Sequence, residues 1–332
     1  MSFLSKNIEQ VCNEIFEGNR RTLAKAITLI ESNNNKHRKF AHKILNKLNT
    51  NKSKGESIRI GITGIPGAGK STFIESLGNY LLNDENKIAV LAIDPSSRIS
   101  KGSILGDKTR MSKLSNNPNV FIRPTAASNF QGGIAKNTRE SIFLCEAAGF
   151  NIIFIETVGV GQNEISVFEI VDFFLLLKIA GSGDELQGIK RGIIEMSDLI
   201  VINKTDGDNI DKSIIAKNEF QMALKIFSKK ESGWIPEVMN CSSIENNGII
   251  EIWDKITSYF KLVKGNNYFY KNRVNQNKYW LREIINQSII NNFYQNEKVR
   301  REYMSQIKKI EENKVDVFEA YQKIILSQKS KT

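Results

Sequence analysis

A glycine-rich segment between an apolar run and a helical run restricts the fold of this chain most strongly. The segment Gly64-Ile-Pro-Gly-Ala-Gly-Lys-Ser-Thr72 follows the apolar run Ile58 to Ile62 and precedes the helical run Phe73 to Leu82. Its spacing, G-x-x-x-x-G-K-S, is that of a P-loop, in which backbone N–H groups surround the phosphates of a nucleotide. Lys70 would then reach the terminal phosphates, and Ser71 would offer its hydroxyl to Mg2+. We expect the nucleotide to contact Gly64, Ile65, Pro66, Gly67, Ala68, Gly69, Lys70, Ser71 and Thr72.

Further apolar runs alternate with helical segments along the middle of the chain. Most of these runs are continuously apolar, as is typical of strands that are covered on both faces. The sequence therefore predicts an α/β fold with a doubly wound, mostly parallel sheet and helical N- and C-terminal extensions. The predicted strands are residues 58–63, 88–94, 120–124, 151–156, 173–179, 199–203 and 238–241.

The two ends of the chain have a different pattern from the middle. Residues 1–55 show helical periodicity and end in a polar linker, and residues 264–332 are again helical with apolar stripes. Such stripes need a partner, either the nucleotide domain or a second subunit, and we expect a homodimer. The predicted domains are a helical arm at 1–55, a P-loop domain at 56–263 and a helical dimerisation region at 264–332.

Charge and composition narrow the class of protein. The net charge is +11, but residues 56–263 carry 22 basic and 25 acidic side chains, so the excess positive charge lies in the helical flanks. There it is interleaved with apolar positions, which favours solvated helix faces over a nucleic-acid surface. No stretch approaches the roughly 20 apolar residues of a membrane span, and the start lacks a signal pattern, so we expect a cytoplasmic protein without membrane contact. The scattered Cys12, Cys145 and Cys241, with His37 and His42, indicate no dedicated metal site of Cys and His ligands.

A second motif, Asn203-Lys204-Thr205-Asp206, follows the apolar run 199–202. Loops at the carboxyl end of such a strand are where a bound base would lie. The carboxylate of Asp206 accepts two hydrogen bonds and matches the N1–H and the exocyclic amine of guanine, whereas adenine presents a different edge. The motif therefore predicts GTP and GDP as ligands in preference to ATP.

Three acidic residues lie between the two motifs, each at or near the end of an apolar run or in a glycine-bearing loop. Asp94 and Glu156 end predicted strands, and Asp107 lies in Gly102-Ser-Ile-Leu-Gly-Asp107. Carboxylates at these places suit Mg2+, which prefers hard oxygen ligands. Gly159, shortly after Glu156, could present its N–H to a γ-phosphate.

Longer segments make the chain similar to the ArgK/MeaB family of GTPases associated with adenosylcobalamin-dependent methylmalonyl-CoA mutase. The resemblance is dense from Arg59 to Trp253 and loose in the helical flanks. It implies a G domain of the SIMIBI type. The segments that carry the resemblance are residues 93–97, 102–111, 140–150, 156–162 and Gly183-Asp-Glu-Leu-Gln-Gly-Ile-Lys-Arg-Gly192.

The resemblance also implies roles for particular residues. Lys70, Asp94, Asp107 and Glu156 would serve catalysis, and Ser71 would join the three carboxylates around Mg2+ and the attacking water. Departures from the family pattern are Ser243, where alanine is usual, and Lys101, which replaces a common glycine. By resemblance, Cys241, Ser242, Ser243 and Ile244 form the last base-contacting loop, and Asp184, Gln187 and Lys190 form a switch that couples the nucleotide state to the mutase.

The sequence therefore predicts a Mg2+-dependent GTPase that gates cobalamin loading on an acyl-CoA mutase and protects that enzyme. Hydrolysis of this kind needs positioning and charge neutralisation, and a partner is expected to complete the site. The alternative is an ATP-dependent kinase linked to lysine, arginine or ornithine transport. Metal insertion is disfavoured by the lack of a His and Cys cluster, and a non-hydrolysing module by the presence of Lys70, Ser71, Asp94 and Glu156.

Overall fold

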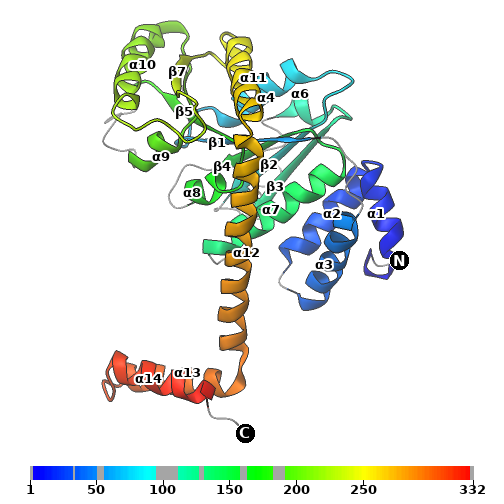
Figure 1. Ribbon diagram of the computed structural model, residues 1–332, viewed down its shortest axis with the longest axis vertical. Coiled ribbons are helices and arrows are strands. Elements are labelled where there is room, and N and C mark those ends of the chain that lie inside the picture. The colour runs from blue at the N-terminus through cyan, green and yellow to red at the C-terminus, as the bar shows by residue number, and fades with distance from the viewer. Residues whose placement is uncertain are drawn as a thin grey trace. The chain divides into compact units, whose positions relative to one another are not determined.

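The chain forms two compact units, Met1–Val274 and Asn275–Thr332, shown as one ribbon in Figure 1. The computed structural model describes residues 3–32, 34–50, 56–94, 111–126, 131–157, 163–181 and 191–329. Within these ranges no helix is long and apolar enough to span a lipid bilayer.

A seven-stranded sheet with the order β3-β2-β4-β1-β5-β6-β7 forms the centre of the first unit. All of its strand pairs are parallel, so the α/β prediction is confirmed. Their carboxyl ends meet at one edge, where a parallel sheet places its ligands. The strands are β1 (Ile58–Thr63), β2 (Ile88–Asp94), β3 (Val120–Ala126), β4 (Ile152–Thr157), β5 (Phe173–Ile179), β6 (Leu199–Asn203) and β7 (Glu237–Asn240).

Three strands depart from their predicted limits: β4 is shifted by one residue, to Ile152–Thr157, and the two edge strands differ as follows. Strand β3 continues past Pro124 to Ala126. A proline lacks the N–H needed by a second neighbour, but β3 is an edge strand and pairs only with β2. Strand β7 ends at Asn240, which leaves Cys241 in the following loop.

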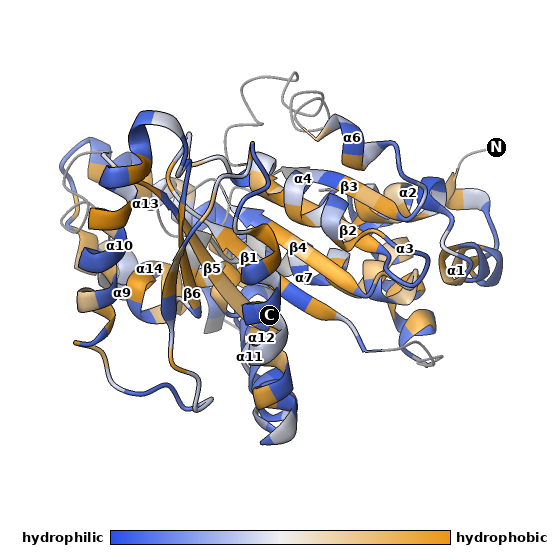
Figure 2. Ribbon diagram, turned by 90° about the horizontal axis from the view of Figure 1, so that it is seen from above, coloured by the Kyte–Doolittle hydropathy of each residue, from blue (hydrophilic) through white to orange (hydrophobic). Residues whose placement is uncertain are grey.

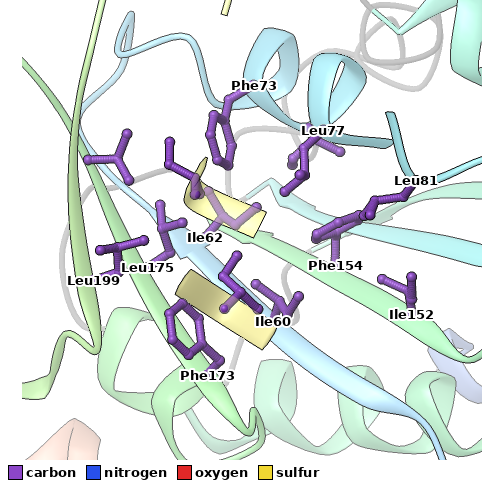
Figure 3. Close-up of a cluster of buried hydrophobic side chains, with 14 of the residues drawn as sticks. Ile60, Ile62, Phe73, Leu77, Leu81, Ile152, Phe154, Phe173, Leu175 and Leu199 are labelled. Carbon is purple, nitrogen blue, oxygen red and sulfur yellow. The ribbon is translucent and has the colours of Figure 1, made fainter. Parts of the chain in front are cut away.

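One face of the sheet is covered by α4 (Lys70–Leu81) and α11 (Ile249–Gly265), which contact each other. Figure 3 shows Phe73, Leu77 and Leu81 of α4 beside the inward residues of β1 and β4. The short helix α6 (Ser112–Ser115) adds Leu114 to this cluster. Because successive strand residues alternate between the faces, Ile60 and Ile62 point to this layer.

The opposite face is covered by α7 (Gln131–Ala147), α8 (Asn163–Phe168), α9 (Arg191–Met196) and α10 (Ile210–Leu224). Here Leu91, Ile155 and Phe174 join one cluster, and Ile200 and Phe220 join another. With both faces covered, the strands are apolar along their length, and Figure 2 shows β4, β5 and β6 mainly in orange. A short 3-10 helix, η3 (Gly207–Asn209), precedes α10.

Helices α1 (Ile8–Phe16), α2 (Arg20–Glu31) and α3 (Asn35–Thr50) follow the short 3-10 helix η1 (Phe3–Ser5). Asn7 and Asn19 cap α1 and α2 by accepting from backbone N–H groups of their first turns. The helices pack on α7 (Figure 1), and Ile15, Ile27 and Ile44 belong to the same cluster as Leu91 and Ile155. The predicted arm therefore shares its core with the sheet.

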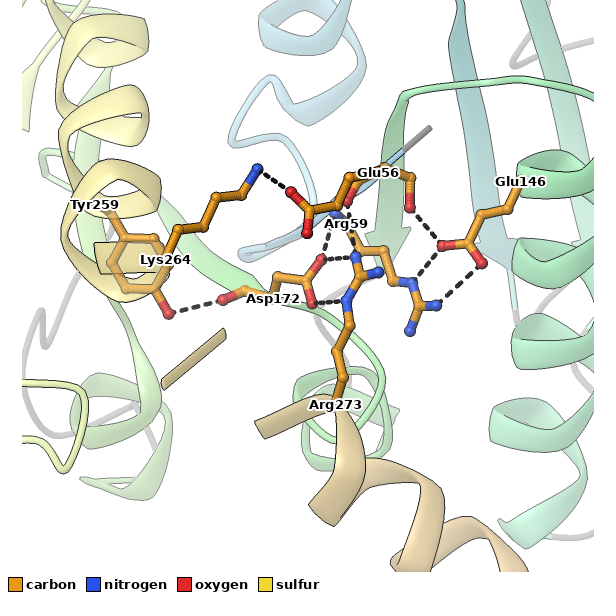
Figure 4. Close-up of polar contacts among 8 residues, drawn as sticks. Glu56, Arg59, Glu146, Asp172, Tyr259, Lys264 and Arg273 are labelled. Carbon is orange, nitrogen blue, oxygen red and sulfur yellow. Dashed lines mark hydrogen bonds and ion pairs between the residues drawn. The ribbon is translucent and has the colours of Figure 1, made fainter. Parts of the chain in front are cut away.

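A network of partly buried ion pairs lies at the amino ends of β1 and β5 (Figure 4). Arg273, in the first turns of α12 (Tyr268–Gln295), donates to both carboxylate oxygens of Asp172 at 2.9 and 2.6 Å and to the Ser57 carbonyl at 2.8 Å. Asp172 also accepts from the backbone N–H of Arg59, whose guanidinium pairs with Glu146 of α7 at 2.8 and 3.1 Å. The network thus joins the start of α12 to β1, β5 and α7.

The second unit consists of the later part of α12 together with α13 (Glu297–Glu311) and α14 (Val317–Lys329). Asn296 caps α13 by accepting from the N–H groups of Lys298 and Val299. Several apolar side chains of this unit are exposed. Along α12 they follow one helix face at Leu281, Ile285 and Ile289, which are exposed by 59, 48 and 61%.

Candidate nucleotide-binding site

The predicted P-loop connects the carboxyl end of β1 to the first residue of α4, Lys70. Gly67 and Gly69 have φ angles of 81° and 87°, in the left-handed region that favours glycine. At Gly64 the backbone passes so close to β5 that a Cβ would lie 2.1 Å from the Leu177 carbonyl oxygen. The sequence thus has glycine where the turn requires it.

Lys70 is buried, with only 8% of its surface exposed, although it carries a positive charge. Its ammonium donates to the carbonyl oxygens of Gly64 and Ile65 at 2.8 and 3.1 Å. These bonds fold the side chain over the P-loop and compensate the cost of burying the charge. The ammonium is therefore held beside the turn that would receive the phosphates.

Ser71 and Glu156, distant in sequence, meet at the same edge of the sheet. The Ser71 hydroxyl donates to Glu156 Oε1 at 3.0 Å, and the hydroxyl of the next residue, Thr157, donates to Thr63 Oγ1 at 2.9 Å. Asp94 is the last residue of β2, two positions beyond the residue in register with Glu156. A hydroxyl and a carboxylate in contact are oxygen donors of the kind that Mg2+ takes, so this pair fits the metal.

Asn203 joins the second predicted motif to the P-loop. Its amide nitrogen donates to the Ala68 carbonyl at 2.8 Å, and a Cβ on Gly69 would lie 2.6 Å from that nitrogen. Lys204 has a φ of 58°, which turns the chain away from β6 and brings its side chain toward Gly69. The two predicted motifs therefore contact each other directly.

Asp206 is oriented by the loop after β7. The Ser242 hydroxyl donates to Asp206 Oδ2 at 2.5 Å, and the backbone N–H of Thr205 donates to the Cys241 carbonyl at 3.0 Å. Ser242 is buried, whereas Ile244 is 74% exposed. The loop after β7 thus holds the Asp206 carboxylate in one orientation, next to the loop that follows β6.

The third residue of that loop, Ser243, is buried and contacts Asn203 through both its backbone and its side chain. Its N–H and its hydroxyl donate to Asn203 Oδ1 at 3.1 and 2.8 Å, and the Cys241 sulfur lies 3.3 Å from the same oxygen. Burial raises the pKa of the Cys241 thiol to about 12, so the sulfur stays protonated and acts as a weak donor.

Sequence reasoning missed Ser76 of α4, whose hydroxyl donates to the Ser243 carbonyl at 2.5 Å. A serine inside a helix carries no signal of a distant partner. Five predicted site residues, Asp107, Gly159, Asp184, Gln187 and Lys190, lie outside the described residues, as does Lys101.

The chain is similar in sequence to one family of known proteins. Residues 23–298 match the family model described as "Methylmalonyl Co-A mutase-associated GTPase MeaB". GTPase ArgK of Escherichia coli is 43% identical over 297 residues, which cover 90% of this chain and 89% of that protein. The mouse protein "Methylmalonic aciduria type A homolog, mitochondrial" is 41% identical over 303 residues, covering 89% of this chain and 73% of that protein.

A solved structure has nearly the same extent as this chain. The crystal structure of a protein described as "LAO/AO transport system kinase" superposes with a TM-score of 0.75 at 34% identity. The match covers 97% of this chain and 98% of that one.

Proposed function

Because the chain belongs to the MeaB family of methylmalonyl-CoA mutase-associated GTPases, we propose that it is a GTP-hydrolysing chaperone for an adenosylcobalamin-dependent acyl-CoA mutase. The chain is a GTPase, and GTP is its ligand. In the proposed role, its nucleotide state gates the loading of cobalamin on the mutase and protects the mutase from inactivation. Methylmalonyl-CoA mutase is the partner that the family description favours.

The observation that best supports this proposal is the oriented carboxylate of Asp206 beside a P-loop. Asp206 would read the N1–H and the exocyclic amine of guanine, while Ser242 holds the carboxylate at 2.5 Å. Asn203 joins this loop to Ala68 of the P-loop. A base site and a phosphate site in direct contact suit a switch that responds to the whole nucleotide.

GTP hydrolysis requires the protein to position the reacting groups and to neutralise charge, and it requires little covalent chemistry from the side chains. Lys70 would neutralise charge on the terminal phosphates from its position over Gly64 and Ile65. Ser71 and Glu156 would hold Mg2+, with Asp94 and Asp107 as further carboxylates around it, and the metal would offset phosphate charge when bound. No arginine finger is identifiable from the sequence, so the intrinsic rate should be slow and the mutase should raise it.

The direct test mixes the purified chain with methylmalonyl-CoA mutase and measures GTP turnover and co-purification. We expect a stable complex and faster hydrolysis than with the chain alone. Lys190→Ala, in the proposed coupling switch, should lose the stimulation and keep the basal rate. If Lys190→Ala responds to the mutase like the wild type, the proposed coupling role of that segment fails. If the chain instead co-purifies with an unrelated enzyme, the partner is not the mutase.

A second candidate is an ATP-dependent kinase linked to amino-acid transport, because the similar crystal structure is that of a protein described as a transport system kinase. Asp206 distinguishes the two proposals, since adenine does not present the two donors that a carboxylate accepts. Competition between GTP and ATP for the wild-type chain decides between them. Equal affinity for the two nucleotides would favour the kinase.

A further inference from the structure

Ser243 and Asn203 are part of a continuous set of hydrogen bonds that joins three elements of the site. Asn203 donates to the Ala68 carbonyl in the P-loop and accepts from the N–H and the hydroxyl of Ser243. The carbonyl of Ser243 in turn accepts from Ser76, which lies on the helix that begins at Lys70. These hydrogen bonds therefore connect the P-loop, the loop at Ser243 and α4, the helix that follows the P-loop.

These hydrogen bonds restrain the elements strongly because they are mostly buried. Asn203 and Ser243 are exposed by only 1 and 3%, and Ser76 is half-buried. A buried polar group that loses its partner incurs a desolvation penalty, so each bond resists separation of the elements it joins. The side chain of Ser243 matters here, because an alanine at this position would keep the backbone bond and lose the hydroxyl bond.

The loop after Ser243 adds a rigid support. Ser242 and Asn247 exchange backbone hydrogen bonds at 3.0 and 3.1 Å, which closes the loop into a tight turn. Gly248 then has a φ of 77°, and a Cβ there would lie 2.6 Å from the Asn240 carbonyl oxygen. A closed loop moves as one body, so a restraint on Ser243 also restrains Ser242 and, through it, Asp206.

We propose that Ser76 and Ser243 are positioning residues that tie the base-binding loop to helix α4 and thereby slow the release of guanine nucleotide. This inference rests on the proposed function, in which Asp206 contacts the base and the start of α4 contacts the phosphates. The base end and the phosphate end of the nucleotide are then held by one connected unit. To leave, the nucleotide must break contacts at both ends together.

The expected size follows from the hydrogen bonds involved. Removing one such bond costs about 0.5–1.5 kcal/mol, so each single variant should release nucleotide roughly 2- to 13-fold faster. The double variant should release faster than either single one, but by less than the product of the two factors. Both serines restrain the same loop, so the second loss acts on a loop that is already loosened.

The experiment measures the dissociation of a fluorescent GDP analogue, chased with excess GDP, from the full chain and from Ser76→Ala, Ser243→Ala and the double variant. Ser258→Ala and Ser213→Ala are matched controls, because each of these serines donates to a carbonyl of its own helix region at 2.8 Å. We expect the controls to match the wild type. Ser76→Thr keeps the hydroxyl and should restore slow release.

Unfolding in urea without nucleotide separates positioning from general stability. Faster release supports the inference when the urea midpoint falls no further than in Ser213→Ala, which also loses one serine hydrogen bond, and so does rescue by Ser76→Thr. A larger fall of the midpoint with no rescue by Ser76→Thr would overturn it. Wild-type release rates in both alanine variants would overturn it while leaving GTP binding intact. If the wild-type chain itself fails to bind the GDP analogue, the proposed function fails instead.

Discussion

At the scale of single residues, Asp206 is the group whose chemistry is easiest to test. Asp206→Asn replaces one acceptor oxygen by a donor, so one of the two guanine donors would face another donor. We expect the affinity for GTP to fall by about 100-fold and the affinity for xanthosine triphosphate to rise, because xanthine carries a carbonyl in place of the amine. Isothermal titration calorimetry with both nucleotides measures the change.

Asp208→Asn is the matched control for that substitution, since Asp208 is exposed in the next turn, η3. It should bind GTP like the wild type. Unchanged GTP affinity in Asp206→Asn would remove Asp206 from the base site.

The glycines of the P-loop allow a second test at this scale. Gly64→Ala would place a Cβ 2.1 Å from the Leu177 carbonyl oxygen, whereas Gly67→Ala meets no atom within 4 Å. Both residues have positive φ angles, 155° and 81°, which disfavour a Cβ, but only at Gly64 does the Cβ also meet a close backbone atom. In urea unfolding without nucleotide, Gly67→Ala should cost about 1 kcal/mol, and Gly64→Ala several times as much. Equal losses would show that β5 moves aside to accept the Cβ.

At the scale of elements, the ion pairs in Figure 4 hold β1, α7 and the start of α12 together. Burial of Glu146 opposes its ionisation, but Arg59 and the Ser57 hydroxyl outweigh burial and hold the pKa of Glu146 below its ordinary value of 4.5. The unfolded chain takes up this proton at a higher pH than the folded chain does. The stability that Glu146 contributes is therefore complete above about pH 4.5 and is lost as the pH falls below it.

This linkage predicts how Glu146→Gln changes the pH dependence of stability. The variant should be less stable than the wild type at pH 7. Its free energy of unfolding should fall less steeply than that of the wild type between about pH 5 and about pH 3. Urea unfolding at several pH values measures the slope. Glu297→Gln is the control, because its carboxylate side chain is 84% exposed and its pair with Arg301 is a surface contact. A slope unchanged by Glu146→Gln would mean that other carboxylates carry the acid response.

The elements also show why part of this structure follows from the sequence and part does not. Strands β1, β2, β5 and β6 have their predicted limits because strands covered on both faces are apolar from end to end. Parallel strands bring their carboxyl ends together, so the meeting of the P-loop with the loop at Asn203 could also be predicted. The Ser76 contact could not, since its partner is a backbone carbonyl far along the chain. Arg273 and Asp172 are likewise single charges whose pairing depends on the finished fold.

At the scale of the whole molecule, the exposed apolar stripe of α12 supports the proposed homodimer. Ile285→Asp with Ile289→Asp would put two charges on this stripe, and charges are costly to bury in an interface. We expect the wild-type chain to sediment as a dimer and the double variant as a monomer. Asn286→Asp, exposed on the same helix off the stripe, should remain dimeric. A dimeric double variant would place the contact elsewhere.

The position of β1 in the sheet has a consequence for synthesis of the chain on the ribosome. Strand β1 is made early, yet its two neighbours, β4 and β5, follow much later, and the carbonyl that shapes the turn at Gly64 belongs to Leu177 of β5. A nascent chain that ends before β5 holds the complete P-loop sequence without the strand that fixes its shape. The growing polypeptide should therefore gain its ability to hold GTP late, once Asn203 and the loop at Ser242 have also left the exit tunnel.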